Sequence, residues 1–386
     1  MIKKSSLSRV TFDSKPSPGV INLGIGQPSD DLLPVSLLHK ASENFLKTAK
    51  PEEFNYGETQ GDIRFRESLA ILLRQEYGVE TRTDSLMLTC GNSQALDFIC
   101  GRFTKPGDTV FVEEPSYFLA FQIFRDHGLD IVPIPMDEDG LVIEALEQAL
   151  KTSIPSLLYT IPSFSNPGGQ TLSATRRQQL VDLSREYDFV IAADEVYQML
   201  GYFGEAPAAL GTMIDRGNVI SMGTFSKIMA PGLRLGWIQA AQHLMEIAMG
   251  SGWVNSGGSV NHVTSHIVRH AINMGLQTSF IGKLREAYRN RVLAMDAALK
   301  EHLSGHARWN RPDGGYFFWL ELDTSVDVAG LRSRAFDQGV GFQPGDVFTN
   351  TGNFKNYIRL SFAHYREADI HQGVKRLAAL LKYQSP

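Results

Sequence analysis

Apolar residues gather in short continuous runs through the middle of the chain, and stretches with helical periodicity separate some of these runs. Runs of this kind are typical of strands that are covered on both faces. Five of them are predicted strands: residues 85–89, 109–112, 156–160, 189–193 and 218–222. A helical pattern over 174–187 separates two of the runs. The alternation predicts an α/β fold with a mostly parallel sheet and helices on both of its faces.

The pattern changes in the last third of the chain. A long polar helical stretch, roughly Ile281 to Glu301, is followed by two further apolar segments at 314–320 and 357–362. This order predicts a helix that leads from a large domain into a smaller α+β domain. No internal repeat or low-complexity tract is evident.

Composition places the chain among ordinary folded proteins. Its 386 residues allow two or more domains, and 43% hydrophobic with 20% charged residues argues against overall disorder. Lys and Arg total 37 against 42 Asp and Glu, a formal net charge of −5 without long runs of one sign. We therefore expect no nucleic-acid partner.

Cysteine usage and the N-terminal segment bear on the compartment. Cys90 and Cys100 are ten residues apart and form no CxxC pair, which favours buried, reduced thiols. The basic residues 1–6 are not followed by a long apolar core, and no 18-residue apolar span occurs. The sequence therefore predicts a cytoplasmic protein with no membrane partner.

The most informative run is residues 223–237, Gly-Thr-Phe-Ser-Lys-Ile-Met-Ala-Pro-Gly-Leu-Arg-Leu-Gly-Trp. The amine of Lys227 can form a Schiff base with an aldehyde cofactor. Hydroxyls at Thr224 and Ser226 and the guanidinium of Arg234 suit a phosphate dianion. The tetrapeptide 224–227 alone would more often be a helix start with a solvated lysine. The residues that follow it favour a pyridoxal phosphate site.

This run resembles the lysine motif of the class I and II aminotransferases of fold type I, and the resemblance extends through nearly the whole chain. It implies a pyridoxal-phosphate-dependent transferase with a large cofactor-binding domain at 49–285. A discontinuous small domain would comprise 1–48 and 286–386. Lys227 would anchor the cofactor and act as the catalytic base. Within the family, residues 224–237 are most similar to the aromatic and 2-aminoadipate aminotransferases.

A second motif, Ala193-Asp194-Glu195-Val196-Tyr197, follows a strongly apolar strand. An acidic residue at a strand end is commonly only a turn or capping carboxylate. The family's Asp-x-x-Tyr pattern implies instead that Asp194 keeps the pyridine nitrogen of the cofactor protonated and that Tyr197 binds the phenolic oxygen. Glu195 would point to the other side of an extended segment.

Residues 89–96 combine a strand end, a glycine turn and a helix start, whose free amides favour an anion. An ordinary capped helix would show the same pattern. The resemblance assigns Ser93 and Gln94 to the cofactor phosphate. It also assigns Tyr117, in Pro115-Ser116-Tyr117, to stacking on the cofactor ring, although a core tyrosine is the simpler alternative.

Three further positions are assigned to the substrate. Asn166 begins an Asn-Pro-x-Gly match that could also be a plain turn, and the resemblance implies contacts with the phenolic oxygen and the substrate carboxylate. Arg359 lies between apolar residues, where an unpaired guanidinium is costly. A structural salt bridge would satisfy it, whereas the family's arginine binds the α-carboxylate. Gly26 would let the backbone approach the substrate, unless its loop is only a turn.

Tyr56 lies in a segment that resembles the family's Tyr-x-x-x-x-Gly, whose tyrosine reaches the cofactor phosphate of the neighbouring subunit. The resemblance therefore implies a homodimer with shared active sites.

Three histidines have a spacing that could place them on one helix face. His262, His266 and His270 are four residues apart, but no HExxH motif or carboxylate partner accompanies them. A polar or interface face is favoured, and no metal is expected.

Together these motifs predict an aminotransferase that moves an amino group from an L-amino acid to a 2-oxo acid. The expected donor is aromatic or 2-aminoadipate-like, and 2-oxoglutarate is the expected acceptor. A β-lyase or another non-transaminating enzyme would keep every cofactor residue. A pyridoxal-phosphate-binding regulatory protein is the remote alternative, because the short segment before Ile21 leaves no room for a DNA-binding domain.

Overall fold

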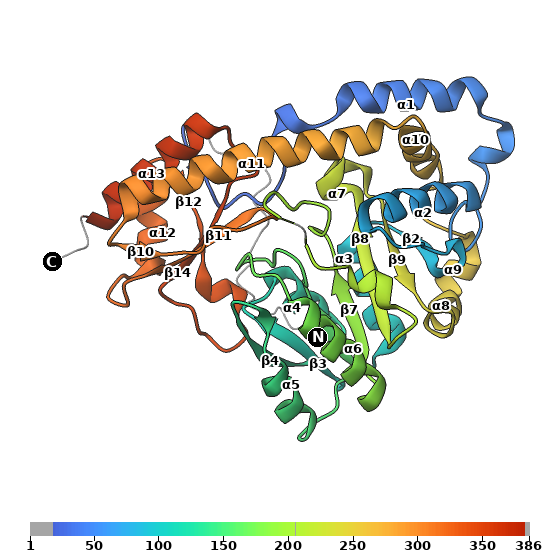
Figure 1. Cartoon of the computed structure of the whole chain (residues 1–386), viewed down its shortest axis with the longest axis horizontal. Coiled ribbons are helices and arrows are strands. Elements are labelled where there is room, and N and C mark those ends of the chain that lie inside the picture. The colour runs from blue at the N-terminus through green and yellow to red at the C-terminus, as the bar shows by residue number, and fades with distance from the viewer. Residues whose placement is uncertain (1–17, 205, 383–386) are drawn as a thin grey trace, which may run out of the picture.

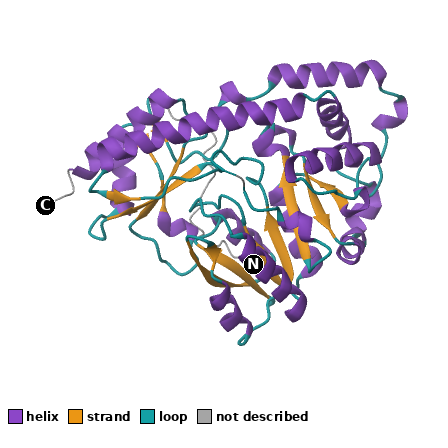
Figure 2. Ribbon diagram, in the orientation of Figure 1, coloured by secondary structure: helices purple, strands orange, loops and turns teal. Residues whose placement is uncertain are grey.

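The long helix α11 (Leu276–Leu303) connects two β-sheets of different kinds (Figure 1). The computed structural model describes residues 18–204 and 206–382. Figure 2 shows the larger sheet with helices packed around it and the smaller sheet beneath the far end of α11. No helix in the described ranges is long and apolar enough to span a bilayer.

The larger sheet has the strand order β2-β9-β8-β7-β6-β3-β4-β5. Its strands are β2 (Leu86–Thr89), β3 (Thr109–Glu114), β4 (Asp130–Asp137), β5 (Gly140–Leu141), β6 (Leu157–Thr160), β7 (Val190–Asp194), β8 (Val219–Thr224) and β9 (Gly236–Ala240). The run from β8 to β4 is parallel, whereas β9 is antiparallel to both of its neighbours. All five predicted strands are confirmed. The α/β class with a mostly parallel sheet is confirmed as well.

The continuous apolar runs form central strands because each face of the sheet has its own core. On β6, Leu157 and Tyr159 join one hydrophobic cluster and Leu158 joins the other. Helices α3 and α4 contribute to the first cluster, and α5 and α6 to the second. Successive side chains of a strand point to opposite faces, so both sets of positions must be apolar.

The other helices are α1 (Val35–Thr48), α2 (Ile63–Tyr77), α3 (Asn92–Phe103), α4 (Phe118–Asp126), α5 (Ile143–Leu150), α6 (Ala174–Tyr187), α7 (Phe225–Ile228), α8 (Gln242–Met249), α9 (Gly252–Gly257), α10 (His262–Asn273), α12 (Val328–Asp337) and α13 (Glu367–Lys382). The predicted helix over 174–187 coincides with α6, where the Ser173 side chain caps the first turn and Asp188 ends the helix in the left-handed region. Helix α11 extends beyond the predicted stretch at both ends.

The smaller sheet is antiparallel, in the order β10-β11-β14-β13. Its strands are β10 (Ala307–Arg308), β11 (Phe317–Leu322), β13 (Gln343–Pro344) and β14 (Tyr357–Ser361). A separate parallel pair joins β1 (Ile21–Asn22) to β12 (Val340–Gly341). The start of the described chain therefore lies beside its C-terminal part.

Helix α1 packs against a different part of the chain from β1. It packs along α10, and Phe45 stacks on His266 with ring centroids 5.3 Å apart. The sequence places 1–48 with the C-terminal part, but α1 finds its apolar partners on α10. The division into 49–285 and 1–48 with 286–386 stays a prediction, and residues 1–17 lie outside the described ranges.

Three segments that carry Gly91, Gly223 and Gly236 approach one another closely. A Cβ on Gly236 of β9 would lie 2.6 Å from the Gly223 carbonyl oxygen and 2.9 Å from Gly91 Cα, and backbone atoms cannot move aside. Gly236→Ala should therefore lower the free energy of unfolding by about 1–3 kcal/mol. Thermal unfolding of the apoprotein measures this.

The matched control is Gly282→Ala in α11, where an added Cβ meets nothing within 4 Å. This change should be neutral or stabilising by up to about 1 kcal/mol, because alanine favours the helix. Equal unfolding midpoints for the Gly236→Ala variant and the wild type would show that the three segments are not packed as described.

Candidate active site

A cavity of about 370 Å³ opens at the carboxyl ends of the parallel strands, the place where open α/β sheets bind ligands. Both sheets contribute to its lining. The predicted site residues that line it are Gly26, Ser93, Tyr117, Asn166, Asp194, Tyr197, Thr224, Ser226, Lys227, Arg234 and Arg359. Residues separated by more than 300 positions thus share one cavity.

Lys227 enters the cavity from α7, a single helical turn directly after β8. The Thr224 hydroxyl caps this turn by accepting a hydrogen bond from the Ser226 amide. Lys227 Nζ donates to the Gly26 carbonyl oxygen over 2.9 Å. Burial, and then the positive charge of Arg359, lower the pKa of the Lys227 amine to about 8. A substantial fraction of this amine is therefore neutral near physiological pH.

Asp194 is the last residue of β7 and is 7% exposed. The Tyr159 hydroxyl donates to its Oδ2 over 2.8 Å, and Asn92 Nδ2 donates to its Oδ1 over 2.5 Å. Burial raises the pKa of Asp194, whereas these two donors favour the charged form. The sequence did not predict either partner. Asn92 lies in the recognised helix start, but nothing in the pattern of β6 distinguishes Tyr159.

Glu195 faces the opposite side of the same segment. It accepts hydrogen bonds from the amides of Leu210 and Gly211 and from the Ser221 hydroxyl, at 2.6, 3.1 and 2.5 Å. Arg177 Nη1 lies 4.0 Å from it. Glu195 therefore ties β7 to the following loop and does not line the cavity, in keeping with the alternation expected for an extended segment.

The start of α3 and Arg234 form a cradle for an anion. Gly91 has a φ of 87°, which only glycine adopts readily, and a Cβ there would lie 3.4 Å from Arg234 Nη2. Arg234 donates to the Cys90 carbonyl oxygen over 2.9 Å and forms no ion pair with a carboxylate of the described residues. Ser93, Thr224 and Ser226 add hydroxyls to this part of the lining. An unpaired guanidinium beside free helix amides suits a phosphate group.

Two predicted cofactor ligands lie outside the lining. The Gln94 side chain turns back, and its Oε1 accepts a hydrogen bond from the Cys90 amide over 2.9 Å. It therefore closes the turn before α3 and does not face the cavity. Tyr56 is 84% exposed, which leaves it free to contact another molecule. The phosphate contacts expected of both residues stay predictions.

Arg359 occupies the centre of β14 and is 4% exposed. Its Nη1 donates to Asn166 Oδ1 over 2.8 Å and its Nη2 to the Gly24 carbonyl oxygen over 2.9 Å. The guanidinium lies 4.0 Å from the centre of the Phe317 ring. No carboxylate in the described ranges pairs with it, so the structure does not contain the alternative salt bridge. A buried cation without a counter-ion suits a carboxylate ligand.

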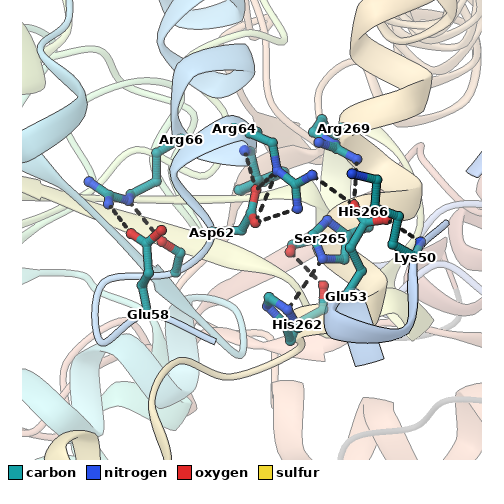
Figure 3. A network of polar contacts seen from close by, with 12 residues as sticks. Lys50, Glu53, Glu58, Asp62, Arg64, Arg66, His262, Ser265, His266 and Arg269 are labelled. Atoms are coloured by element: carbon teal, nitrogen blue, oxygen red, sulfur yellow. Dashed lines mark hydrogen bonds and ion pairs between the residues drawn. The ribbon is translucent and has the colours of Figure 1, made fainter. Parts of the chain in front are cut away.

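The predicted histidine face lies on α10, away from this cavity. His262 Nε2 and His266 Nε2 are 3.3 Å apart, and burial lowers the pKa of His266 to about 4, so that it stays neutral. Figure 3 shows these rings beside a polar network in which Arg64 binds both Asp62 and Glu53. The polar helix face is thus part of the packing of α10 on α2.

One group of side chains in the described ranges could share an ion: Glu301, His302 and His371, where α11 meets α13. It is remote from the cavity. The expectation of no metal stays untested.

Comparison with known proteins gives a consistent result. The family described as "Aminotransferase class I and II" matches residues 18–377. The chain is 35% identical to aromatic-amino-acid aminotransferase 1 of Thermococcus litoralis, over 94% of this chain and 88% of the relative.

Two solved structures are similar over almost their whole length. One is a multiple substrate aminotransferase from Thermococcus profundus, with a TM-score of 0.91 and 33% identity, which covers 100% of this chain and 96% of the other. The second is an α-aminoadipate aminotransferase from Thermus thermophilus in complex with N-(5'-phosphopyridoxyl)-L-leucine. Its TM-score is 0.86 at 30% identity, with 95% of this chain and 93% of the other covered.

The lowered pKa of Lys227 can be measured on the apoprotein by reductive methylation with formaldehyde, which requires a neutral amine. Modification of Lys227 should rise with pH around a midpoint near 8, well below the ordinary lysine value of 10.5. Arg359→Met should move this midpoint upward, because a like charge is removed. Peptide mass spectrometry across pH measures both. A midpoint near 10 in the wild type would show that Lys227 is not buried beside a cation.

Proposed function

The chain belongs to the class I and II aminotransferases and is a pyridoxal-phosphate-dependent enzyme of that family. We propose that Lys227, Asp194 and Arg359 carry the transfer of an amino group from an L-amino acid to a 2-oxo acid. The observation that carries the proposal is the buried Lys227 amine, which shares one cavity with the Asp194 carboxylate and the Arg359 guanidinium. A base, a charged partner for a cofactor ring and a carboxylate site are the three groups that amino-group transfer needs.

The cavity residues fit the phosphate group of the cofactor. Arg234 has no carboxylate partner among the described residues, and the free amides of α3 add a positive dipole end. Hydroxyls of Ser93, Thr224 and Ser226 can donate to further phosphate oxygens. We assign phosphate binding to these side chains. Gln94 is a further candidate from the sequence, but its side chain would first have to give up the hydrogen bond from the Cys90 amide.

The residues around Asp194 fit the cofactor ring. Asp194 would hold the proton on the ring nitrogen, and Asn92 and Tyr159 keep its carboxylate charged and oriented. Burial raises the pKa of Tyr197, so its hydroxyl stays protonated and can donate to the phenolic oxygen, as can Asn166. Tyr117 lines the same cavity and is assigned to stacking on the ring.

When bound, pyridoxal phosphate supplies an aldehyde carbon for the amino group and a ring that withdraws electrons from the substrate α-carbon. Arg359 and Asn166 would hold the α-carboxylate and so orient the α-hydrogen toward Lys227. Lys227 Nζ would then accept the α-proton, a role that its lowered pKa favours near neutral pH. With a 2-oxo acid, the protonated Lys227 would return a proton to the α-carbon.

The substrate proposal is an aromatic or 2-aminoadipate-like L-amino acid as donor and 2-oxoglutarate as acceptor. Two of the three similar proteins named above are an aromatic-amino-acid and an α-aminoadipate aminotransferase, which supports this choice, and all three are aminotransferases, which favours transfer over lyase chemistry. Apolar side chains of Phe118, Leu119, Ile123 and Phe317 line part of the cavity and suit an aromatic group.

We also propose a homodimer in which Tyr56 reaches the partner's cofactor phosphate. Tyr56 is accompanied by other exposed large apolar side chains on neighbouring segments, Phe54, Trp253 and Val263 among them. Exposed apolar groups on adjoining elements are typical of an interaction surface. The cytoplasmic location expected from the sequence stays a prediction.

Asp194→Ala should separate cofactor binding from chemistry. The phosphate contacts remain, so the cofactor should still bind, but exchange of the substrate α-hydrogen for deuterium should slow by about a hundredfold or more. Nuclear magnetic resonance measures the exchange. Asp130→Ala, at an exposed carboxylate on β4, should leave the rate unchanged. Exchange at near wild-type rate in the Asp194 variant would remove Asp194 from the assigned role.

Tyr56→Phe tests the shared site. Within one chain the Tyr56 hydroxyl is exposed, so its removal should matter only if a second subunit uses it. Cofactor affinity should fall about tenfold, the effect of one charge-assisted hydrogen bond, while sedimentation still shows a dimer. Tyr187→Phe, outside the cavity lining, is the control. A monomeric wild type, or unchanged affinity in the variant, would contradict the shared site.

A further inference from the structure

Gln343 lies beside the carboxylate site and has no place in the assigned mechanism. In the small sheet it pairs directly with Arg359, and residues directly opposite each other on antiparallel strands point to the same face. Its side chain lies close to the N-terminal loop, since a Cβ added to Gly24 would lie 3.3 Å from Gln343 Cγ. Gln343 and Arg359 both line the cavity.

The side-chain oxygen of Gln343 is buried without a hydrogen bond. The residue is 7% exposed, and its Oε1 has no partner among the described residues. Gln198, also buried, differs: its Oε1 accepts from the Ser163 hydroxyl and its Nε2 donates to the Pro207 carbonyl oxygen. A buried amide with unmet hydrogen-bonding groups lowers stability unless a ligand uses it.

The guanidinium of Arg359 also has an unmet hydrogen-bonding group. Arg359 Nε is buried without a partner, and no described carboxylate neutralises the charge. Two unmet polar groups therefore lie at directly opposed positions of β13 and β14. A carboxylate offers about four lone-pair sites, which is more than a guanidinium fork and the Asn166 amide fill.

We propose that Gln343 is a substrate-binding residue whose amide N–H group donates to the α-carboxylate held by Arg359. The amide oxygen is the atom buried without a partner, so the amide nitrogen, which is the only donor of this side chain, is the atom available to a ligand in the cavity. The proposal rests on the function assigned to the cavity. It implies that Gln343 recognises the group common to every donor and acceptor, and not the substrate side chain.

The test uses Gln343→Met, which keeps the length of the side chain and removes its hydrogen-bonding groups. Spectral titration of the holoenzyme with 3-phenylpropionate and with 4-methylpentanoate should show both affinities reduced about tenfold and by similar factors. Phenethylamine, which has no carboxylate, should bind equally well. The thermal midpoint of the apoprotein should stay the same or rise, because an unpaired amide is removed.

Gln198→Met is the matched control. It removes an amide whose oxygen and nitrogen each make a hydrogen bond outside the cavity lining, so it should lower the thermal midpoint and leave carboxylate affinity unchanged. Gln343→Glu provides a second variant of the same shape. It replaces the donor by an acceptor beside the bound anion and should weaken both carboxylates more than Gln343→Met does.

The contrary outcomes separate failure of the Gln343 inference from failure of the proposed function. Unchanged carboxylate affinity, a loss that depends on the tail of the carboxylate, or a lowered apoprotein midpoint in Gln343→Met would overturn this inference alone. If the wild-type holoenzyme binds neither carboxylate, the carboxylate site at Arg359 is wrong, and the proposed function falls together with the inference.

Discussion

Burial of two cationic side chains in one cavity is the constraint on which the site depends. Lys227 and Arg359 share the cavity with a single buried carboxylate, Asp194, that pairs with neither of them directly. Removal from water affects the charge of these two side chains differently. It lowers the pKa of Lys227 to about 8, which suits the base proposed here, whereas Arg359 keeps its charge and has no carboxylate partner among the described residues.

The fold keeps these groups together by joining distant segments around one loop. Lys227 follows β8 of the large sheet and Arg359 lies on β14 of the small sheet, yet both donate to carbonyl oxygens of the N-terminal loop, at Gly26 and Gly24. A Cβ on Gly26 would lie 3.0 Å from the Phe317 ring, so glycine is what permits this approach. The loop therefore couples the positions of Lys227 and Arg359.

Local patterns and motifs in the sequence predicted the main strands and several residues of the cavity. Apolar runs located the five strands, helical periodicity located α6, and the lysine motif located a buried amine in the cavity. Partners created by the sheet registers were missed: Tyr159 reaches Asp194 from the adjacent strand, and Gln343 faces Arg359 across β13 and β14. The hydrogen bond from the Cys90 amide to Gln94 was missed as well, because the motif does not show which way this side chain turns; its phosphate contact stays a prediction.

The identity of the lysine that carries the cofactor tests the proposed site most directly. The protein is loaded with pyridoxal phosphate, reduced with borohydride, digested, and mapped by mass spectrometry. We expect one modified peptide with the cofactor fixed to Lys227, because its lowered pKa favours the neutral amine that attacks the aldehyde. Modification at a different lysine, or no uptake of cofactor by the unmodified protein, would contradict the proposed site.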